Sequence, residues 1–501
     1  MQNTDNATTD PAADLAAPGG AESSELKTAP PPISRATKLA HGFGAIAPGV
    51  IVGAFDFFLL IFYSQVVGLD AWLVGLAIWI ALAFDAISDP IVGYWTDNLR
   101  SRWGRRHPFM YASAIPIAGS FFLLWAPPEG ASQMTLFWYV LILAILIRTA
   151  VTFYRTPSTA LIPDMTRDYD ERTSLYSLRF LFAWMGGNAI AVVMFFILFP
   201  SFATESIPDG RFNPDAYALY GIIGSIVVFV SIIVSSMGTH ARIPYLNQPP
   251  PARKMTLMLV FRELFETLSN RSFMALFVAA LFGAIASGVV SVLSLYFFTY
   301  FWEFTDVQTG AIFLGTFIAA IIGFVLAPIA SRKLGKKRGA MIVGLVAFAG
   351  APLPIVLRLL DVLPPNGTPF VFWFVTITNI VDIGLIICFQ ILFASMVADL
   401  VEESEIKTGR RSEGVFTAAE TFIRKSVQGL GVAAATLILA MAQFPTGADV
   451  QEVSPESVRR LGIYYVPLVL LLYMTMIAVI STYQIDRDVH EANVKKLQEA
   501  R

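Results

Sequence analysis

Long, uninterrupted apolar segments constrain the fold of this chain more than any other feature. A helix that spans a bilayer needs about 20 mostly apolar residues, and segments of that length recur along the sequence. They are too long and too continuous to alternate as half-buried strands do. Their approximate limits are 42–66, 71–96, 108–127, 134–160, 176–200, 216–239, 272–302, 309–331, 339–360, 368–396, 414–443 and 461–483. The sequence therefore predicts an all-α membrane protein with twelve transmembrane helices.

The scarcity of charge excludes the soluble classes of protein. Of the 501 residues, 55% are hydrophobic and only 14% are charged, against roughly 25% charged residues in a soluble domain. Such a chain cannot cover a water-facing surface of its size, which excludes a soluble enzyme, a nucleic-acid-binding protein and a disordered scaffold. The sequence also lacks the HExxH and GxSxG motifs and any His–carboxylate metal cluster. We therefore expect no enzyme activity, no cofactor and no nucleic-acid partner.

Charge and proline content divide the chain into regions. Residues 1–38 are rich in Ala, Pro, Thr, Asp and Ser and predict a disordered tail. The longest charged break, at 240–271, holds three consecutive prolines that cannot continue a helix. It separates two sets of six apolar segments, which predict an N-terminal bundle at 39–239 and a C-terminal bundle at 272–484. A charged tail follows at 485–501.

The distribution of Lys and Arg predicts the orientation in the membrane. If the N-terminus lies inside, the tails and connections on that side carry 26 of these residues, whereas those on the opposite side carry 4. Basic connections stay in the cytoplasm. We therefore expect a multi-pass protein of the plasma (bacterial inner) membrane, surrounded by the lipid bilayer, with both termini and the 240–271 linker cytoplasmic. We expect it to be a monomer.

A basic turn recurs at equivalent places in the two sets of segments. Residues 98–106 (NLRSRWGRR) follow the second segment, and residues 331–339 (SRKLGKKRG) follow the eighth. Two unrelated cytoplasmic loops could share this composition, but a tight cationic turn repeated six helices later is typical of a duplicated transporter. We predict gating or structural roles for three arginines of the first turn: Arg102, Arg105 and Arg106.

Ionisable residues inside the predicted segments need a reason, because inserting a charge costs at least about 2.5–3.5 kcal/mol. Asp85 and Asp89 are one helical turn apart in the second segment, with Ser88 beside them. Two carboxylates this close repel each other, and a proton or an oxygen-coordinated cation relieves the repulsion. The trio therefore predicts a coupling site for Na⁺ or H⁺, although Asp89 could instead cap or bond near Pro90.

The first and fourth segments carry further polar residues. Arg148, Thr152, Arg155 and Thr159 form a stripe along one face of the fourth segment. Thr152 can offer an oxygen to a cation, and Arg155 can bind a hydroxyl, carboxylate or phosphate. Alternatively, the arginines only pair with the carboxylates. Asp56, near the middle of the first segment, can bind sugar hydroxyls, attract a cationic substrate or pair with an arginine.

Two later segments also contain charged residues. In the eleventh, Glu420 and Arg424 are four residues apart and could form an ion pair. That pair would leave Lys425 free to face a cavity, where we predict that it contributes to substrate binding. In the tenth, Asp382 lies near Asn379. We predict gating or structural roles for Asp382, Glu420 and Arg424.

These residues together resemble one family of transporters. The segment 85–94 (DAISDPIVGY) and the basic turn 100–106 (RSRWGRR) are similar to the glycoside–pentoside–hexuronide:cation symporters of the major facilitator superfamily. The resemblance continues at 157–166 (PSTALIPDMT) and covers about residues 40–485. It implies two six-helix bundles around a central cavity, and cation-coupled uptake by alternating access.

The resemblance also implies roles for single residues. The paired cation-site carboxylates of the family correspond to Asp85 and Asp89, and its threonine ligand to Thr152. Ser88 stands where the family has an asparagine, which keeps one oxygen ligand. Two further positions correspond to functional residues of the family's cavity: Arg179 and Lys425.

The sugar site departs from that of the melibiose permease, a member of this family. Two acids of that protein correspond to Gly49 and Arg155 here, and a stacking tryptophan corresponds to Thr159. Asp56 lies on the same helical face as Gly49 and could replace one acid, whereas Arg155 could equally indicate an anionic substrate such as a uronide. We therefore expect cation-coupled symport of a saccharide, glycoside or uronide. An uncoupled facilitator or a lysolipid-type transporter of the same fold is the alternative.

Overall fold

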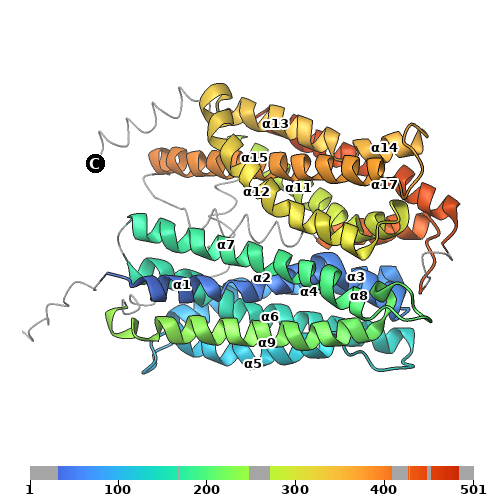
Figure 1. The fold of residues 1–501 in the computed structure, drawn as a ribbon. Helices are drawn as coiled ribbons and strands as arrows, with labels where there is room; N and C mark the ends of the chain where they lie inside the picture. The colour runs from blue at the N-terminus through green and yellow to red at the C-terminus, as the bar shows by residue number, and fades with distance from the viewer. Residues whose placement is uncertain are drawn as a thin grey trace, which may run out of the picture. The chain divides into compact units, whose positions relative to one another are not determined.

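The regular secondary structure of the described residues is helical throughout, as the sequence predicts. The computed structural model describes residues 32–166, 169–246, 271–408, 427, 429–447 and 453–484, and these ranges contain no strand. Contacts divide the chain into two units, Met1–Pro32 and Ile33–Arg501. Of the first unit only Pro32 is described, and the helices of Figure 1 belong to the second.

The first half of the chain forms six spans. The first span covers Arg35–Val66, and its α-helical hydrogen bonding is interrupted by a turn at 44–45 and by two short π-helical turns, η1 and η2. The elements in chain order are α1 Arg35–Phe43, α2 Ile46–Gly53, η1 Ala54–Phe58, α3 Leu59–Ile61, η2 Phe62–Val66, α4 Ala71–Asn98, α5 His107–Leu124, α6 Gln133–Met165, α7 Tyr169–Val193, η3 Met194–Leu198, α8 Phe199–Ser201, η4 Gly210–Phe212, α9 Pro214–His240 and η5 Ile243–Tyr245.

The second half continues the same pattern of long apolar helices. Its elements are α11 Arg271–Tyr296, η6 Phe297–Phe301, α12 Asp306–Leu334, α13 Lys336–Gly350, α14 Leu353–Leu359, α15 Pro369–Thr408 and α17 Pro455–Ile480. An apolar helix, Gly429–Met441, lies between α15 and α17.

Eleven helices of the described residues are long and apolar enough to cross a membrane. They match eleven of the twelve predicted segments. The remaining segment, 414–443, falls largely outside the described residues, and its described part is the shorter helix Gly429–Met441. An all-helical membrane fold is therefore confirmed, while the twelfth span stays a prediction.

The predicted region boundaries are only partly covered by the structure. Helix α1 begins at Arg35, before the expected end of the N-terminal tail, because the Ser34 side chain caps it by accepting a hydrogen bond from the Thr37 amide at 3.1 Å. The expected linker, 240–271, is described only at its two edges, and the expected tail, 485–501, lies outside the described residues. The division into two bundles stays a prediction.

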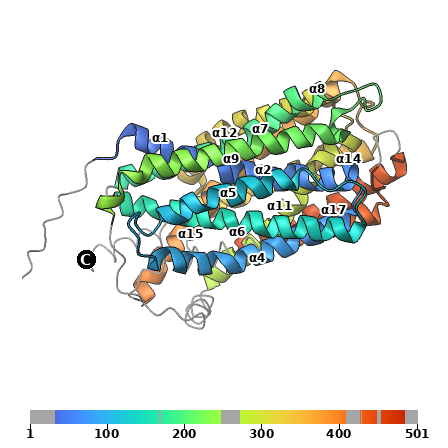
Figure 2. The same cartoon turned by 90° about the horizontal axis from the view of Figure 1, so that it is seen from below.

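Close backbone approaches bring the helices of each half together. In the first half, α5 runs beside α6 and α9, and α2 lies beside α7 (Figures 1 and 2). A Cβ atom on Gly187 of α7 would lie 2.7 Å from the carbonyl oxygen of Gly49, so glycine is required at this crossing. In the second half, α12 and α13 both pack on α15, and α11 packs on α17. The halves meet where α7 and η3 contact α12, and where η1 contacts α11.

The connections define two ends of the helical unit. At one, which we call the basic end, residues 98–107 and 334–336 join consecutive helices, whereas residues 66–71 lie at the opposite, far end. The two basic turns share a backbone feature: φ is 72° at Gly104 and 77° at Gly335. Glycine adopts this left-handed region without the steric penalty of a side chain. The repeat in sequence is therefore also a repeat in conformation.

Candidate functional site

Three of the predicted cation ligands meet between α4 and α6. The Thr152 hydroxyl oxygen of α6 lies 2.9 Å from Asp85 Oδ1 and 2.8 Å from Asp89 Oδ1, both on α4. Asp85 and Thr152 are buried, while Asp89 is partly exposed. The i,i+4 spacing on α4 thus places both carboxylates against one side chain of the neighbouring helix.

Ser88, the fourth predicted ligand, is used differently. Its hydroxyl donates to the backbone carbonyl of Asp85 at 3.1 Å, within the same helix. Ser88 is buried, as expected for a residue near the pair. In this conformation its donated hydrogen bond goes to the helix backbone and not to either carboxylate.

Two arginines of α6 pair with the carboxylates. Arg148 Nη1 lies 3.7 Å from Asp85 Oδ2, and Arg155 Nη2 lies 3.2 Å from Asp89 Oδ2. Arg148 also stacks over the Phe55 ring, with its Cζ atom 4.7 Å from the ring centroid. Each arginine is one turn from Thr152, so α6 presents a cation, a hydroxyl and a second cation to the two carboxylates of α4.

The Thr152 hydroxyl group has one hydrogen but lies within hydrogen-bond distance of two carboxylate oxygens. A hydroxyl carries one hydrogen, so Thr152 can donate to only one of the two carboxylate oxygens that approach it. The second approach is favourable when a proton on one carboxyl group donates to Thr152, or when a cation lies among the three oxygens. A proton on one carboxyl group, or a small cation among the three oxygens, would therefore stabilise this arrangement.

Arg179 of α7 lies beside the same stripe of α6. It donates to Ser158 Oγ at 2.5 Å and to Thr159 Oγ1 at 3.0 Å, and its exposed fraction is 9%. The structure thus brings Thr159 into contact with a cationic group. Among the described residues, neither partner of this guanidinium is an acid.

Asp56 lies in η1, the first π turn of the first span, and is partly buried. Its charge acts on Arg148, so it belongs to the same electrostatic cluster as Asp85 and Asp89. Gly49, one of the positions where the melibiose permease has an acid, has no room for one: a Cβ atom there would collide with the Ala183 carbonyl of α7. Of these two positions in the first span, only Asp56 can present a carboxylate.

The first basic turn is anchored to α6. Asp164 accepts hydrogen bonds from Arg105 Nη2 at 2.9 and 3.0 Å and from Arg106 Nε at 2.6 Å, and all three side chains are largely buried. Arg102 is exposed and lies over the Trp103 ring at 5.5 Å from its centroid. The structure thus separates two arginines that hold the turn from one that faces outward.

The predicted residues of the second half are only partly described. Asp382 of α15 is partly buried against α13, where a Cβ atom on Gly350 would lie 2.9 Å from its Oδ1. The described residues offer it no ion pair. The three charged positions of the eleventh segment lie outside the described residues: Glu420, Arg424 and Lys425.

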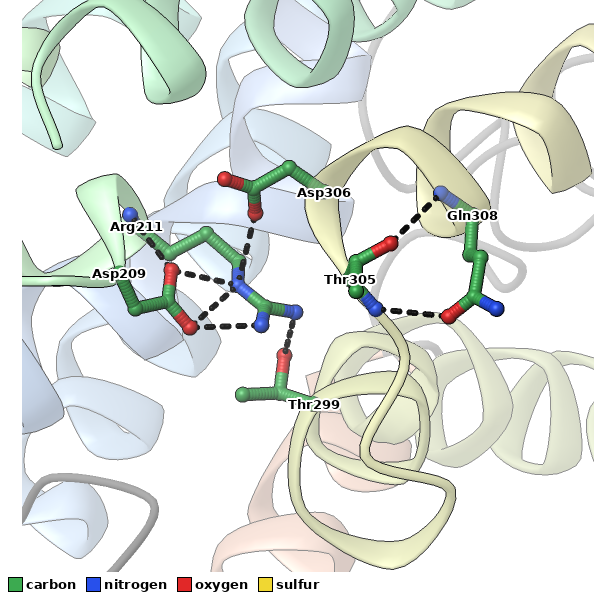
Figure 3. Close-up of polar contacts among 6 residues, drawn as sticks. All are labelled: Asp209, Arg211, Thr299, Thr305, Asp306 and Gln308. Carbon is green, nitrogen blue, oxygen red and sulfur yellow. Dashed lines mark hydrogen bonds and ion pairs between the residues drawn. The ribbon is translucent and has the colours of Figure 1, made fainter. Parts of the chain in front are cut away.

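A second polar cluster joins the two halves at the far end. Arg211 of η4 donates to Asp209 at 2.6–3.0 Å and to Thr299 of η6 at 3.0 Å, and pairs with Asp306 of α12 at 3.0 Å (Figure 3). Beside it, Thr305 and Gln308 cap α12 reciprocally. Burial by itself would lower the pKa of Arg211, but the hydrogen bonds and charge of Asp209, together with the charge of Asp306, raise it above its usual value.

Contacts of the first span reinforce this junction. Ser64 forms a short hydrogen bond with Tyr296 of α11, and its carbonyl accepts from the Gly447 amide at 2.9 Å. Gln65 donates to the Pro445 carbonyl at 3.3 Å. The halves are therefore held together at the far end by two separate sets of hydrogen bonds.

The sequence indicated the α4–α6 cluster but not the far-end junction. Arg148 stood in the predicted stripe, although no site role was assigned to it. Arg211 is one of the four basic residues on the predicted outer side, and the sequence alone predicts no role for it. The small number of basic residues on this side is the one sequence feature that draws attention to Arg211. Its partner across the junction, Asp306, is distant in sequence, so the sequence does not identify the pair.

The family follows from a comparison of the whole sequence. A sequence model described as "MFS/sugar transport protein" matches residues 40–487. The chain belongs to this family. It is therefore a multi-pass membrane transporter of the major facilitator type and not an enzyme, as the motifs predicted.

Several named transporters are similar to this chain over most of their length. An isoprimeverose transporter of Lactiplantibacillus pentosus is 24% identical and covers 76% of this chain and 75% of its own. A sodium-dependent lysophosphatidylcholine symporter of Gallus gallus is 25% identical, covering 94% and 90%. The crystal structure of the nucleoside transporter NupG has a TM-score of 0.58 at 12% identity over 88% of this chain and 98% of its own, which shows the shared fold.

Proposed function

We propose that this protein is a secondary active transporter that couples the movement of a saccharide, glycoside or uronide to Na⁺ or H⁺. The observation that carries the proposal is the position of the Thr152 hydroxyl between oxygens of Asp85 and Asp89. The isoprimeverose transporter among the relatives supports a sugar as the substrate. No resident cofactor is needed, since the ion is cargo.

The proposed mechanism is alternating access with both termini in the cytoplasm. The basic end would then face the cytoplasm and the far end the outside. Cation binding among Asp85, Asp89 and Thr152 would relieve the repulsion of the two carboxylates and favour closure around the substrate. Substrate and cation would each raise the affinity for the other, as thermodynamic linkage requires. The hydrogen bonds at the far end would hold the conformer that is closed to the outside.

The test is uptake into proteoliposomes under imposed Na⁺ and H⁺ gradients, applied separately with a panel of substrates. We expect Asp85→Asn and Asp89→Asn each to abolish gradient-driven accumulation. Asp70→Asn is the matched control, because Asp70 is an exposed carboxylate at the far end of α4 that makes no capping hydrogen bond. Accumulation by either site variant would refute the coupling assignment.

A lysolipid substrate is the second candidate. The similarity to the lysophosphatidylcholine symporter of Gallus gallus over 94% of this chain supports a lysolipid as a candidate substrate. Lysophosphatidylcholine therefore belongs in the substrate panel. Uptake that ignores both ion gradients would instead identify an uncoupled facilitator.

A further inference from the structure

Asp382 is the acidic residue of the second half that lies deepest in a described span. It stands near the centre of the 29-residue span Pro369–Val397. The other acidic residues in described spans of this half lie at helix starts, since Asp306 begins α12 and Glu456 lies in the first turn of α17. A charged side chain at the centre of a spanning helix is costly, and it is retained where it has a partner or a function. Asp382 therefore needs one of the two.

No described residue forms an ion pair with Asp382. By contrast, Asp85, Asp89 and Asp306 each lie 3.0–3.7 Å from an arginine nitrogen. Among the described helices, α11, α12, α13 and α14 contact α15. Their charged residues and ionisable tyrosines lie at or near the helix ends: Arg271, Tyr296, Asp306, the basic turn 331–339 and Arg358. On α15 itself, the next charged residue in sequence is Asp399. A counter-ion within the described part of the chain therefore does not explain Asp382.

The surroundings of Asp382 suit a neutral carboxyl group. A Cβ atom on Gly350, the last residue of α13, would lie 2.9 Å from Asp382 Oδ1, so glycine leaves the room that the carboxyl group occupies. Asn379 is one turn earlier on the same side of α15. Its side-chain oxygen is buried and accepts no hydrogen bond from any described residue. A protonated carboxyl group has an O–H donor, whereas a carboxylate has none. Only the protonated form of Asp382 therefore carries a hydrogen for this oxygen.

We propose that Asp382 is a proton-binding site of the second half, separate from the α4–α6 cluster, and that its proton is taken up and released in each transport cycle. The inference rests on the proposed function and names H⁺ as an ion that this chain carries. On uptake, one carboxylate oxygen takes a proton from the solvent and forms an O–H bond. On release, that bond breaks and the proton returns to the solvent on the opposite side of the membrane. Each half of the chain then holds one ion site.

The proton on Asp382 is linked to the packing of α13 on α15. Two turns further along α15, Phe389 packs edge to face on Phe348 of α13, with ring centroids 5.1 Å apart. A neutral carboxyl group is compatible with this apolar contact, whereas a carboxylate is stabilised by water or by a cation. Proton release therefore favours a conformer in which water reaches α15, and proton binding favours the packed one. The proton thereby shifts the equilibrium between two conformers.

The first measurement is an infrared titration of the purified full-length protein in liposomes, which detects the C=O stretch of protonated carboxyl groups. We expect a carboxyl band at neutral pH that Asp382→Asn removes. Asp361→Asn is the matched control, because Asp361 is an exposed carboxylate in a turn of the same half, and it should retain the band. Asp382→Glu should also retain the band. Gly350→Ala should shift it, since the added Cβ atom would lie 2.9 Å from Asp382 Oδ1.

The second measurement is uptake into proteoliposomes under a H⁺ gradient, with equal Na⁺ on both sides. The probes are isoprimeverose and lysophosphatidylcholine, the compounds in the names of two relatives. Asp382→Asn should accumulate the transported probe at least tenfold less than the wild type, while Asp361→Asn should match the wild type. Exchange of labelled for unlabelled probe without any gradient should persist in Asp382→Asn, which would show that this variant is folded.

The outcomes separate this site from the α4–α6 cluster. A carboxyl band or a H⁺-driven accumulation that is unchanged in Asp382→Asn overturns the proton site, even if Asp85→Asn abolishes coupling. Wild-type uptake that ignores the H⁺ gradient overturns it as well. If Asp382→Asn loses both the band and the accumulation while Asp85→Asn still accumulates the probe, the proton site is retained and the proposed coupling at the α4–α6 cluster is wrong.

Discussion

Arg211 offers the sharpest test of how the two halves are held at the far end. Its side chain is 7% exposed and contacts both Thr299 and Asp306 across the junction, while its bonds to Asp209 stay within the first half. Arg211→Ala would remove both contacts across the junction. It would leave the Asp306 carboxylate beside Asp209 without its counter-ion.

The magnitude follows from the contacts that are lost only when the far end opens. A hydrogen bond involving a charged group contributes about 1.5–3 kcal/mol, and one such bond plus one ion pair cross the junction. We take about 2–4 kcal/mol for both, because the local Asp209 contacts survive opening. Since about 1.4 kcal/mol is a tenfold change, the open-to-closed ratio should rise roughly 30- to 1,000-fold. A minor open state of 0.1–10% would then become a substantial fraction.

The assay is a pulsed electron-spin distance measurement between labels on introduced cysteines at Glu205 and Leu360. Both residues are exposed at the far end, one in each half, and the native Cys388 is buried. Arg211→Ala should add a longer-distance population. Thr299→Val, which loses only the hydroxyl group, should have a smaller effect of about 1 kcal/mol, roughly fivefold.

The control is Arg460→Ala, which breaks an exposed ion pair with Glu456 and a hydrogen bond to Gln443, both at the same end but within the second half. Exposed pairs of this kind contribute about 0.3–0.5 kcal/mol, so its distance distribution should match that of the wild type. If Arg211→Ala also leaves the distribution unchanged, the junction does not hold the far end closed, and the reasoning is wrong.

Three further predictions concern the cation site, the basic turn and α1. Thr152→Val keeps the side-chain shape but removes the shared hydroxyl group, so the cation concentration for half-maximal uptake should rise at least tenfold; an unchanged value would contradict the site. Asp164→Asn should destabilise the protein by about 3 kcal/mol, because it removes a negative charge that pairs with two largely buried arginines. Thermal unfolding in detergent measures this loss, and an unchanged unfolding temperature would show that other contacts hold the turn. Burial would raise the pKa of Glu171, but hydrogen bonds from Thr166 and Lys38 and the charge of Lys38 lower it below its usual 4.5. The resulting stabilisation is complete above pH 4.5 and is lost as the pH falls through the lower folded-state pKa. The hydrogen-exchange protection factors of α1 should therefore fall there, whereas Glu171→Gln should give low protection factors at every pH.

Features that depend on neighbouring residues were predictable. Hydropathy located eleven spans because each helix satisfies its own backbone hydrogen bonds in the membrane. Helical periodicity placed Asp85 and Asp89 on one face, and Thr152 and Arg155 on one stripe. For the arginines of α6 it left two roles open, pairing or ligand binding, since periodicity says which residues share a face but not what that face meets.

Contacts between distant segments were decided only by the tertiary structure. The packing of α4 on α6 brings Thr152 to both carboxylates and pairs Arg155 with Asp89. The close approach of α2 and α7 explains why position 49 is glycine and cannot hold an acid. Neither result follows from spacing along one helix.

The sequence by itself determined the membrane class, the helices and the set of charges retained inside them. The reason is that the free-energy cost of inserting a charged residue into lipid depends on that residue and its segment, not on distant contacts. The tertiary structure decided which of those charges meet. Arg211 and Asp306 are far apart in the chain and adjacent in space. An ion pair depends on distance and burial, and both are properties of the packed helices rather than of any one segment.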